Sequence, residues 1–195
     1  MAMRVVTLSP APAQGRCHAV TITVEELTAT LTDQHQHIKT MMETVVAREG
    51  TDRQAAFAEL CRFLAAHEAA EEECIHATAK EELDGDTAVV DRRIEEEDEA
   101  GKAIAELERL DTESQEFRES FEKFRKAVVA HAEAEEHEEL PKLRGILDDV
   151  EVTRMYEALS RVPDVASQNG DHGTSFKERL QSARAEFRSG APTAR

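Results

Sequence analysis

Two short motifs in this chain place a histidine four residues before a glutamate: His67-Glu-Ala-Ala-Glu71 and His131-Ala-Glu-Ala-Glu135. On an α-helix, residues four apart lie on one face, about 6 Å from each other. An imidazole and a carboxylate placed in this way can bind the same metal ion. Two such pairs on two helices therefore predict a site for more than one metal ion.

The composition indicates a helical domain. The 195 residues are 40% hydrophobic and 33% charged, with 8 Gly, 5 Pro and no Trp, which argues against a sheet. A net charge of −17 excludes nucleic acid and anionic membranes as expected partners. Cys17, Cys61 and Cys74 form no paired framework, and no signal peptide or membrane-spanning run is present, so we expect a cytoplasmic protein.

Hydrophobic periodicity predicts an all-α protein, an up-down-up-down four-helix bundle over residues 23–145. Its helices are expected at about 23–49, 52–83, 87–110 and 115–140. A short additional C-terminal helix, within 146–163, is expected to stop before Pro163. Residues 1–22 are expected to be a flexible arm and 164–195 a flexible tail. Phe176, Leu180, Ala183 and Phe187 predict a short amphipathic helix in that tail, which docks on the bundle or on a partner.

The metal-capable residues occupy the apolar seams of the expected helices. In the second helix the seam of Phe57, Leu60 and Leu64 continues through His67 and Glu71. In the fourth helix the seam likewise continues through His131 and Glu135. His35 interrupts the apolar stripe of the first helix, and Glu97 falls on the stripe of the third.

Counted from the turns, these positions lie at one level of the bundle. The layer contains six residues: His35, His67, Glu71, Glu97, His131 and Glu135. Three buried carboxylates would repel one another and pay a desolvation cost, which bound cations remove. The pattern therefore predicts a buried metal site.

Imidazole and carboxylate ligands without thiolate suit iron, manganese or zinc. A closed structural zinc site would be tetrahedral and usually rich in thiolate, which this site is not. Three histidines and three carboxylates suit two octahedral ions that share bridging carboxylates. A ferritin-like di-metal bundle requires Glu-x-x-His on two helices. Glu73-Cys-Ile-His76 has that spacing, but the fourth helix has no counterpart and His76 is expected to fall off the seam. The sequence therefore disfavours the ferritin-like arrangement.

The pattern over about 23–145 resembles the hemerythrin-like domains, also called HHE cation-binding domains. The stretches of this chain that carry the resemblance are Gln34-His35-Gln-His-Ile38, His67-Glu-Ala-Ala-Glu71, Glu96-Glu97 and His131-Ala-Glu-Ala-Glu135. The chain departs from the family on the third helix, where the histidine is replaced by Glu97 or, with a one-residue shift, by Asp98. Four residues later, where true hemerythrin has another histidine, the chain has Gly101.

The resemblance implies two iron ions with an oxo or hydroxo bridge. One would be held by His35 and His67 and the other by Glu97 and His131, with Glu71 and Glu135 bridging. The expected partners are small molecules, namely O2, H2O2 and NO; a protein partner is unknown. A carboxylate in place of an imidazole should favour the ferric state, which argues against reversible oxygen carriage.

The function expected from this resemblance is the binding or reaction of oxygen species in stress response or redox sensing. Whether the protein is an enzyme stays open. An enzymatic activity would be catalase- or peroxidase-like, and the oxidation of nitric oxide is included among the expected reactions. The alternatives are iron storage or metal handling, and a sensor or interaction module whose tail responds to the metal state.

Overall fold

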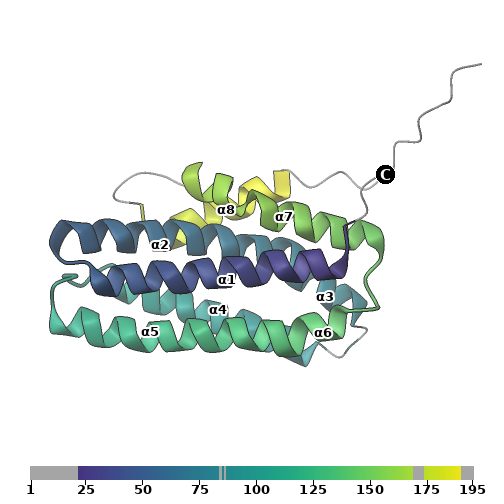
Figure 1. The fold of residues 1–195 in the computed structure, drawn as a ribbon, viewed down its shortest axis with the longest axis horizontal. Coiled ribbons are helices and arrows are strands. Elements are labelled where there is room, and N and C mark those ends of the chain that lie inside the picture. Colours follow the sequence, from purple (N-terminus) through teal and green to yellow (C-terminus); the bar gives the residue numbers. More distant parts are fainter. Residues whose placement is uncertain (1–21, 84, 86, 169–173, 190–195) are drawn as a thin grey trace, which may run out of the picture.

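The computed structural model describes residues 22–83, 85, 87–168 and 174–189 and confirms the all-α fold. Four long helical segments run up, down, up and down, and further C-terminal helices lie on one side of this bundle (Figure 1). The elements are α1 (Val24–Ala47), α2 (Gly50–Ala70), η1 (Glu71–His76), α3 (Ala77–Glu82), α4 (Ala88–Leu107), α5 (Gln115–Ala134), η2 (Glu135–Glu139), α6 (Leu140–Leu143), α7 (Asp149–Gln168) and α8 (Phe176–Ser189). The arm predicted over 1–22 lies outside the described residues except for its last residue.

Local capping starts two of the bundle helices. At Thr23 the side chain accepts a hydrogen bond from the backbone N–H of Glu26, and the Glu26 carboxylate accepts one from the backbone N–H of Thr23. At the start of α5, the Ser114 hydroxyl accepts from the backbone N–H of Phe117. These caps set the starting points, and therefore the level, of the helices that hold His35 and His131.

Two π-helical turns interrupt the bundle just after the two His-x-x-x-Glu motifs. The first, η1, begins at Glu71, and the second, η2, begins at Glu135. A π-turn closes i→i+5 hydrogen bonds, so it contains one residue more than an α-helical turn and rotates all residues that follow. The sequence spacing alone did not predict this rotation.

Helix α2 is the central element of the fold. It packs against α1, α7 and α8, and residues on all its sides are buried, including Cys61, Phe63 and Ala66. An aromatic cluster of Phe57 and Phe117, whose ring centroids are 5.2 Å apart, packs between α2 and α5 at one end of the bundle. This apolar packing holds α2 and α5 together, and the same two helices hold His67 and His131.

Helix α7 continues through Pro163 to Gln168, so the predicted helix end before Pro163 is wrong. A proline inside a helix leaves the carbonyl four residues earlier without its usual N–H donor. Here that carbonyl belongs to Leu159, and the side-chain Nε2 of Gln34 donates to it at 2.7 Å. The proline is tolerated because α1 supplies the missing donor.

The prediction of a flexible tail over 164–195 is also wrong for the described part of that segment. Residues 164–168 complete α7, and α8 packs along α2 through the buried side chains of Phe176, Ala183 and Phe187. Burial of these apolar groups offsets the entropy lost when the segment becomes ordered. The amphipathic segment thus docks on its own bundle.

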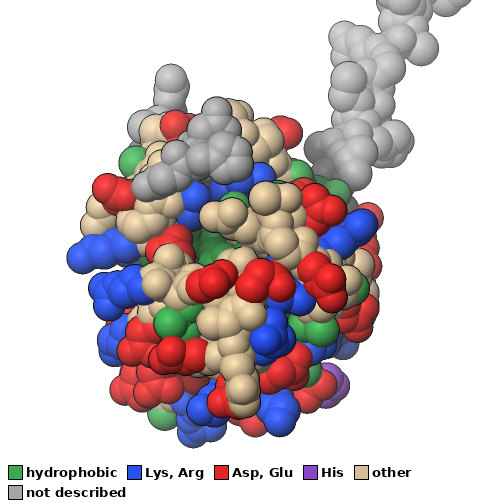
Figure 2. Space-filling model, turned by 90° about the vertical axis from the view of Figure 1, so that its left-hand side faces the viewer, with side chains coloured by type: hydrophobic (Ala, Val, Ile, Leu, Met, Phe, Trp, Pro, Cys, Tyr) green, Lys and Arg blue, Asp and Glu red, His purple; other side chains and the backbone are tan. Residues whose placement is uncertain are grey.

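The surface does not concentrate the negative charge at the end of the bundle that holds the α1–α2 and α4–α5 turns. Figure 2 shows Asp and Glu side chains interspersed with Lys and Arg over this face. Every helix in the described ranges is too short or too polar to cross a membrane.

Candidate metal centre

The structure brings the six residues of the predicted layer together in the interior. His35 comes from the middle of α1, His67 from the end of α2 and His131 from the end of α5. Glu71 and Glu135 are the first residues of η1 and η2. Glu97 lies in the middle of α4, and all six are buried except His131, whose side chain is 12% exposed.

The carboxylate of Glu135 lies between two histidines. Its Oε2 is 3.1 Å from His35 Nε2, and its Oε1 is 3.3 Å from His131 Nε2. Glu71 Oε1 is 3.2 Å from His67 Nε2 and 3.7 Å from His35 Nε2. The side chains thus form two overlapping groups able to hold a metal ion, His35, His67 and Glu71 in one and Glu71, Glu97, His131 and Glu135 in the other.

The outer nitrogen of each of these three imidazoles has an acceptor from a different helix. His35 Nδ1 pairs with Glu136 at 2.8 Å, His67 Nδ1 with Gln34 at 2.9 Å and His131 Nδ1 with Glu96 at 3.1 Å. An acceptor at Nδ1 keeps the proton there and leaves the Nε2 lone pair directed at the centre. The sequence offers one clue to these acceptors: each is next in the chain to a residue of the layer.

Several buried polar atoms of the centre make no hydrogen bond within the described part of the chain. They are His35 Nε2, His131 Nε2, both oxygens of Glu71, Glu97 Oε2 and Glu135 Oε2. His35 Nε2 and Glu135 Oε2 are close, but their geometry is not that of a hydrogen bond. Buried polar groups are rarely left unpaired, because each costs about 1–3 kcal/mol. Imidazole and carboxylate atoms aimed at shared points fit bound cations.

Burial and the neighbouring carboxylates act in opposite directions on the pKa values of the imidazoles of the centre. Burial opposes charge on His35, but Glu135 and Glu71 outweigh it and raise the pKa of His35 to about 10. Burial likewise opposes charge on His131, and Glu135 raises the pKa of His131 to about 11. Burial and the nearby Glu135 carboxylate raise the pKa of Glu71 to about 7. Bound cations would replace these protons as the positive charge among the carboxylates.

His76 points into the centre, so the expectation that it falls off the seam is wrong. Its Nε2 is 2.6 Å from Glu97 Oε1, its Nδ1 is 2.9 Å from Glu139 Oε1, and both His76 and Glu139 are buried. Five residues of α-helix after Glu71 would turn His76 about 140° away from the ligand face. The π-turn η1 brings it back to that face. Both residues were missed because the expected spacing was that of an unbroken α-helix.

The third-helix position is occupied by Glu97 rather than Asp98. Glu97 is 5% exposed, whereas Asp98 lies on the solvent side of α4. Gly101 does not face the centre: a Cβ atom there would meet the Phe176 ring of α8 at 3.7 Å. The glycine therefore adjoins the docked helix and leaves no space beside the layer.

A cavity of about 510 Å³ between α4 and α5 reaches the centre. Glu68, Glu97 and His131 line it, together with apolar side chains that include Phe124 and Val128. Glu68 is buried, and this burial, with the neighbouring Glu97 carboxylate, raises the pKa of Glu68 well above its usual value. A small molecule can approach Glu97 and His131 through this cavity.

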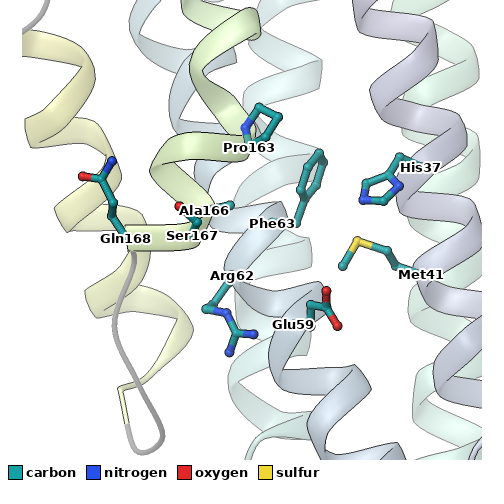
Figure 3. Close-up of a pocket in the computed structure, with 9 residues that line it drawn as sticks. All are labelled: His37, Met41, Glu59, Arg62, Phe63, Pro163, Ala166, Ser167 and Gln168. Carbon is teal, nitrogen blue, oxygen red and sulfur yellow. The ribbon is translucent and has the colours of Figure 1, made fainter.

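A second pocket, of about 650 Å³, lies between α1, α2 and α7 and is separate from the layer. It is lined by His37, Phe63 and Pro163 among others, and the rings of His37 and Phe63 contact each other edge to face, with centroids 4.8 Å apart (Figure 3). Phe63 stacks on His67 with 6.4 Å between ring centroids, so its ring stands between this pocket and the centre. No residue of the six-residue layer lines the pocket, and we assign the chemistry to the smaller cavity.

Comparison with known proteins agrees with this geometry. No curated protein and no solved structure gave a significant match. The family model described as the hemerythrin HHE cation-binding domain matches residues 26–143, which include both His-x-x-x-Glu motifs and every residue of the layer. The match covers more than half of the chain, and the chain therefore belongs to the hemerythrin family of HHE cation-binding domains.

Proposed function

We propose that this protein is a non-haem di-iron protein that binds or reacts with O2, H2O2 or NO. The proposed ligands are His35, His67, Glu71, Glu97, His131 and Glu135. The observation that supports the proposal best is the set of buried, unpaired imidazole and carboxylate atoms directed at two adjoining points. A donor set of nitrogen and oxygen without thiolate favours iron over zinc.

The two oxygens of Glu135 face opposite sides of the layer, Oε2 toward His35 and Oε1 toward His131. This carboxylate is therefore suited to bridge two ions. The outer acceptors Gln34, Glu96 and Glu136 hold the imidazole rings in place and preserve the tautomer that binds metal. When bound, iron would supply redox chemistry that no side chain of the centre provides.

The cavity between α4 and α5 supports neutral small molecules as the reactants. Glu68, Glu96, Glu97, Glu99 and Glu106 line it, and Lys123 and His131 are the basic side chains among its lining residues. Such a wall repels anions but not O2, NO or neutral H2O2. Free thiols at Cys61 and Cys74 support a cytoplasmic location.

Metal analysis and absorption spectra of protein produced with iron test the proposal. We expect about two iron ions per chain and near-ultraviolet absorption of a di-ferric centre that changes on addition of H2O2 or NO. A folded, colourless protein without metal would contradict it, and many more than two ions per chain would indicate storage. Peroxide consumption that Glu135→Ala abolishes would make the protein an enzyme, whereas a spectral change without turnover would make it a binding or sensing protein.

Contacts between α8 and η1 favour a second function, the sensing of the metal state. Arg184 pairs with Glu72, and Arg188 Nη2 lies 2.5 Å from Glu73 Oε1. Both glutamates follow Glu71 within η1, so a movement of Glu71 would be transmitted to the docked helix. Limited proteolysis of α8 in oxidised, reduced and metal-free protein tests this function, and identical digestion in all three states would exclude it.

A further inference from the structure

We propose that His76 is a further metal ligand, supplied by η1 in place of the imidazole that α4 lacks. The proposal rests on the di-metal function above and names a residue outside the six-residue layer. Its first support is orientation, because His76 follows the same pattern as the other three histidines. Nδ1 is held by an acceptor from another element, here Glu139 of η2 at 2.9 Å, and Nε2 points inward.

The second support is where the inward nitrogen lies. His76 Nε2 is 2.6 Å from Glu97 Oε1 and 3.8 Å from Glu135 Oε1. The same Glu135 oxygen is 3.3 Å from His131 Nε2. Two atoms bound to one ion at about 2.1 Å are about 3–4 Å apart, so these side chains can share an ion after a small separation of His76 from Glu97.

This placement divides the centre into two balanced halves. Glu135 Oε2 faces the half with His35, His67 and Glu71, and Glu135 Oε1 faces the half with His131, His76 and Glu97. Each half then has two imidazoles, one from each of two helical segments, and one carboxylate in addition to Glu135. Without His76, the second half would have a single imidazole.

Unpaired atoms in this half of the centre independently support a cation site. Glu97 Oε2 and His131 Nε2 are buried atoms that make no hydrogen bond in the part of the chain that the structure describes. A metal ion bound by His76 Nε2 and Glu97 Oε1 would replace the direct contact of 2.6 Å between these two atoms. Glu139 acts as a positioning residue, since it holds the ring from the side away from the centre.

The rival interpretation makes His76 a structural imidazolium that neutralises Glu97 and Glu139 and touches no metal. Anaerobic titration of metal-free protein with Fe2+ or Mn2+ separates the two. We expect wild type to bind two ions, and His76→Gln to bind the first within about threefold of wild type and the second at least tenfold more weakly. His137→Gln is the matched control: His137 is exposed on η2 and bonds to the Glu133 backbone carbonyl, so both ions should bind as in wild type.

Glu139→Gln keeps an acceptor for Nδ1 and should weaken the second ion less than His76→Gln does. Two ions bound equally well by His76→Gln and wild type would overturn the role of His76 and leave the di-iron function intact. Fewer than two ions in wild type would overturn both. Should His76→Gln not fold, pulsed electron paramagnetic resonance of 15N-histidine-labelled wild type in the mixed-valence state decides: four coordinated imidazoles support the proposal, and three overturn it.

Discussion

Gln34 and His67 are joined by a hydrogen bond of 2.9 Å between the amide Oε1 and the imidazole Nδ1. The Nε2 of the same amide donates to the Leu159 carbonyl at 2.7 Å, the carbonyl that Pro163 leaves without its helical donor. One side chain on α1 therefore holds a proposed ligand on α2 and a proline-containing turn on α7. The fold outside the four-helix bundle is in this way connected to the candidate centre.

Replacement of Gln34 by Leu should weaken both functions of this side chain. The Leu159 carbonyl and His67 Nδ1 lose their partner in a buried place, which should lower the free energy of unfolding by about 1–3 kcal/mol. Loss of the group that orients a ligand should weaken metal binding by about 10- to 100-fold. Urea denaturation and metal titration measure the two effects. Gln36→Leu, on the exposed side of α1, is the control, and equal behaviour of the two variants would contradict the role of Gln34.

The metal-free protein should lose stability as the pH rises above neutrality. The folded pKa values of about 10 for His35 and about 11 for His131 lie above the usual value of 6.5, so protonation favours the folded state. This stabilisation is complete below pH ~6.5 and is lost as the pH rises through the folded pKa values, on the order of 1 kcal/mol per pH unit for each group. Urea denaturation at pH 7, 8 and 9 measures the slope.

His35→Gln should reduce that slope, since one of the two titrating imidazoles is removed. Metal-loaded wild type should show little dependence over the same range, because metal replaces the protons. A flat profile for metal-free wild type would mean that the imidazoles are neutral at pH 7.

Phe187→Ala should release α8 from the bundle. The Phe187 ring is 2% exposed and lies under the Arg161 guanidinium, which is 5.2 Å from the ring centroid. Replacement of a buried phenylalanine by alanine removes about 3–5 kcal/mol of stabilising free energy. We expect a short helix on the surface to undock after a loss of this size. Trypsin should then cleave within α8 faster than in wild type or in Gln181→Ala, a change on its exposed side. Unchanged cleavage would show that the ion pairs to η1 suffice for docking.

Gly101→Ala should be tolerated without loss of metal. The added Cβ would be in ordinary contact with the Phe176 ring at 3.7 Å, and alanine favours an α-helix over glycine by about 0.5–1 kcal/mol. Thermal denaturation should therefore show equal or higher stability, with an unchanged metal stoichiometry. Gly50→Ala is the contrast, because Gly50 has φ +57° and alanine there costs about 1–2 kcal/mol. A loss of metal from Gly101→Ala would place that position in the centre after all.

The bundle and the six-residue layer were predictable because both follow from regular α-helical spacing. The seam through Phe57, Leu64 and His67 needs only a constant turn angle, and the structure keeps that angle as far as Glu71. His76 and Glu139 were missed because the angle changes inside η1 and η2, where no glycine or proline marks the change.

Long-range partners explain the other errors. Proline is expected to end a helix, and Pro163 does not because Gln34, far away in the sequence, satisfies the Leu159 carbonyl. The docking of α8 depends on the surface of α2 and on Glu72 and Glu73 of η1. A single sequence shows that α8 is amphipathic, but it does not show which surface the apolar face of α8 packs against.

Because of the two π-turns, the number of residues between the side chains of the centre matters as much as their types. Each π-turn begins at the glutamate of a His-x-x-x-Glu motif and contains one residue more than an α-helical turn. Deletion of one residue from 72–75 would let η1 become ordinary α-helix and would remove no proposed ligand. The residue now numbered His76 would then stand four positions after Glu71 and on nearly the same face, because the π-turn and the shorter α-turn end on the same side of the helix. An unbroken α-helix of the present length would instead turn His76 and α3 away by about 100°, so the extra residue and the π-turn must occur together for the centre to close.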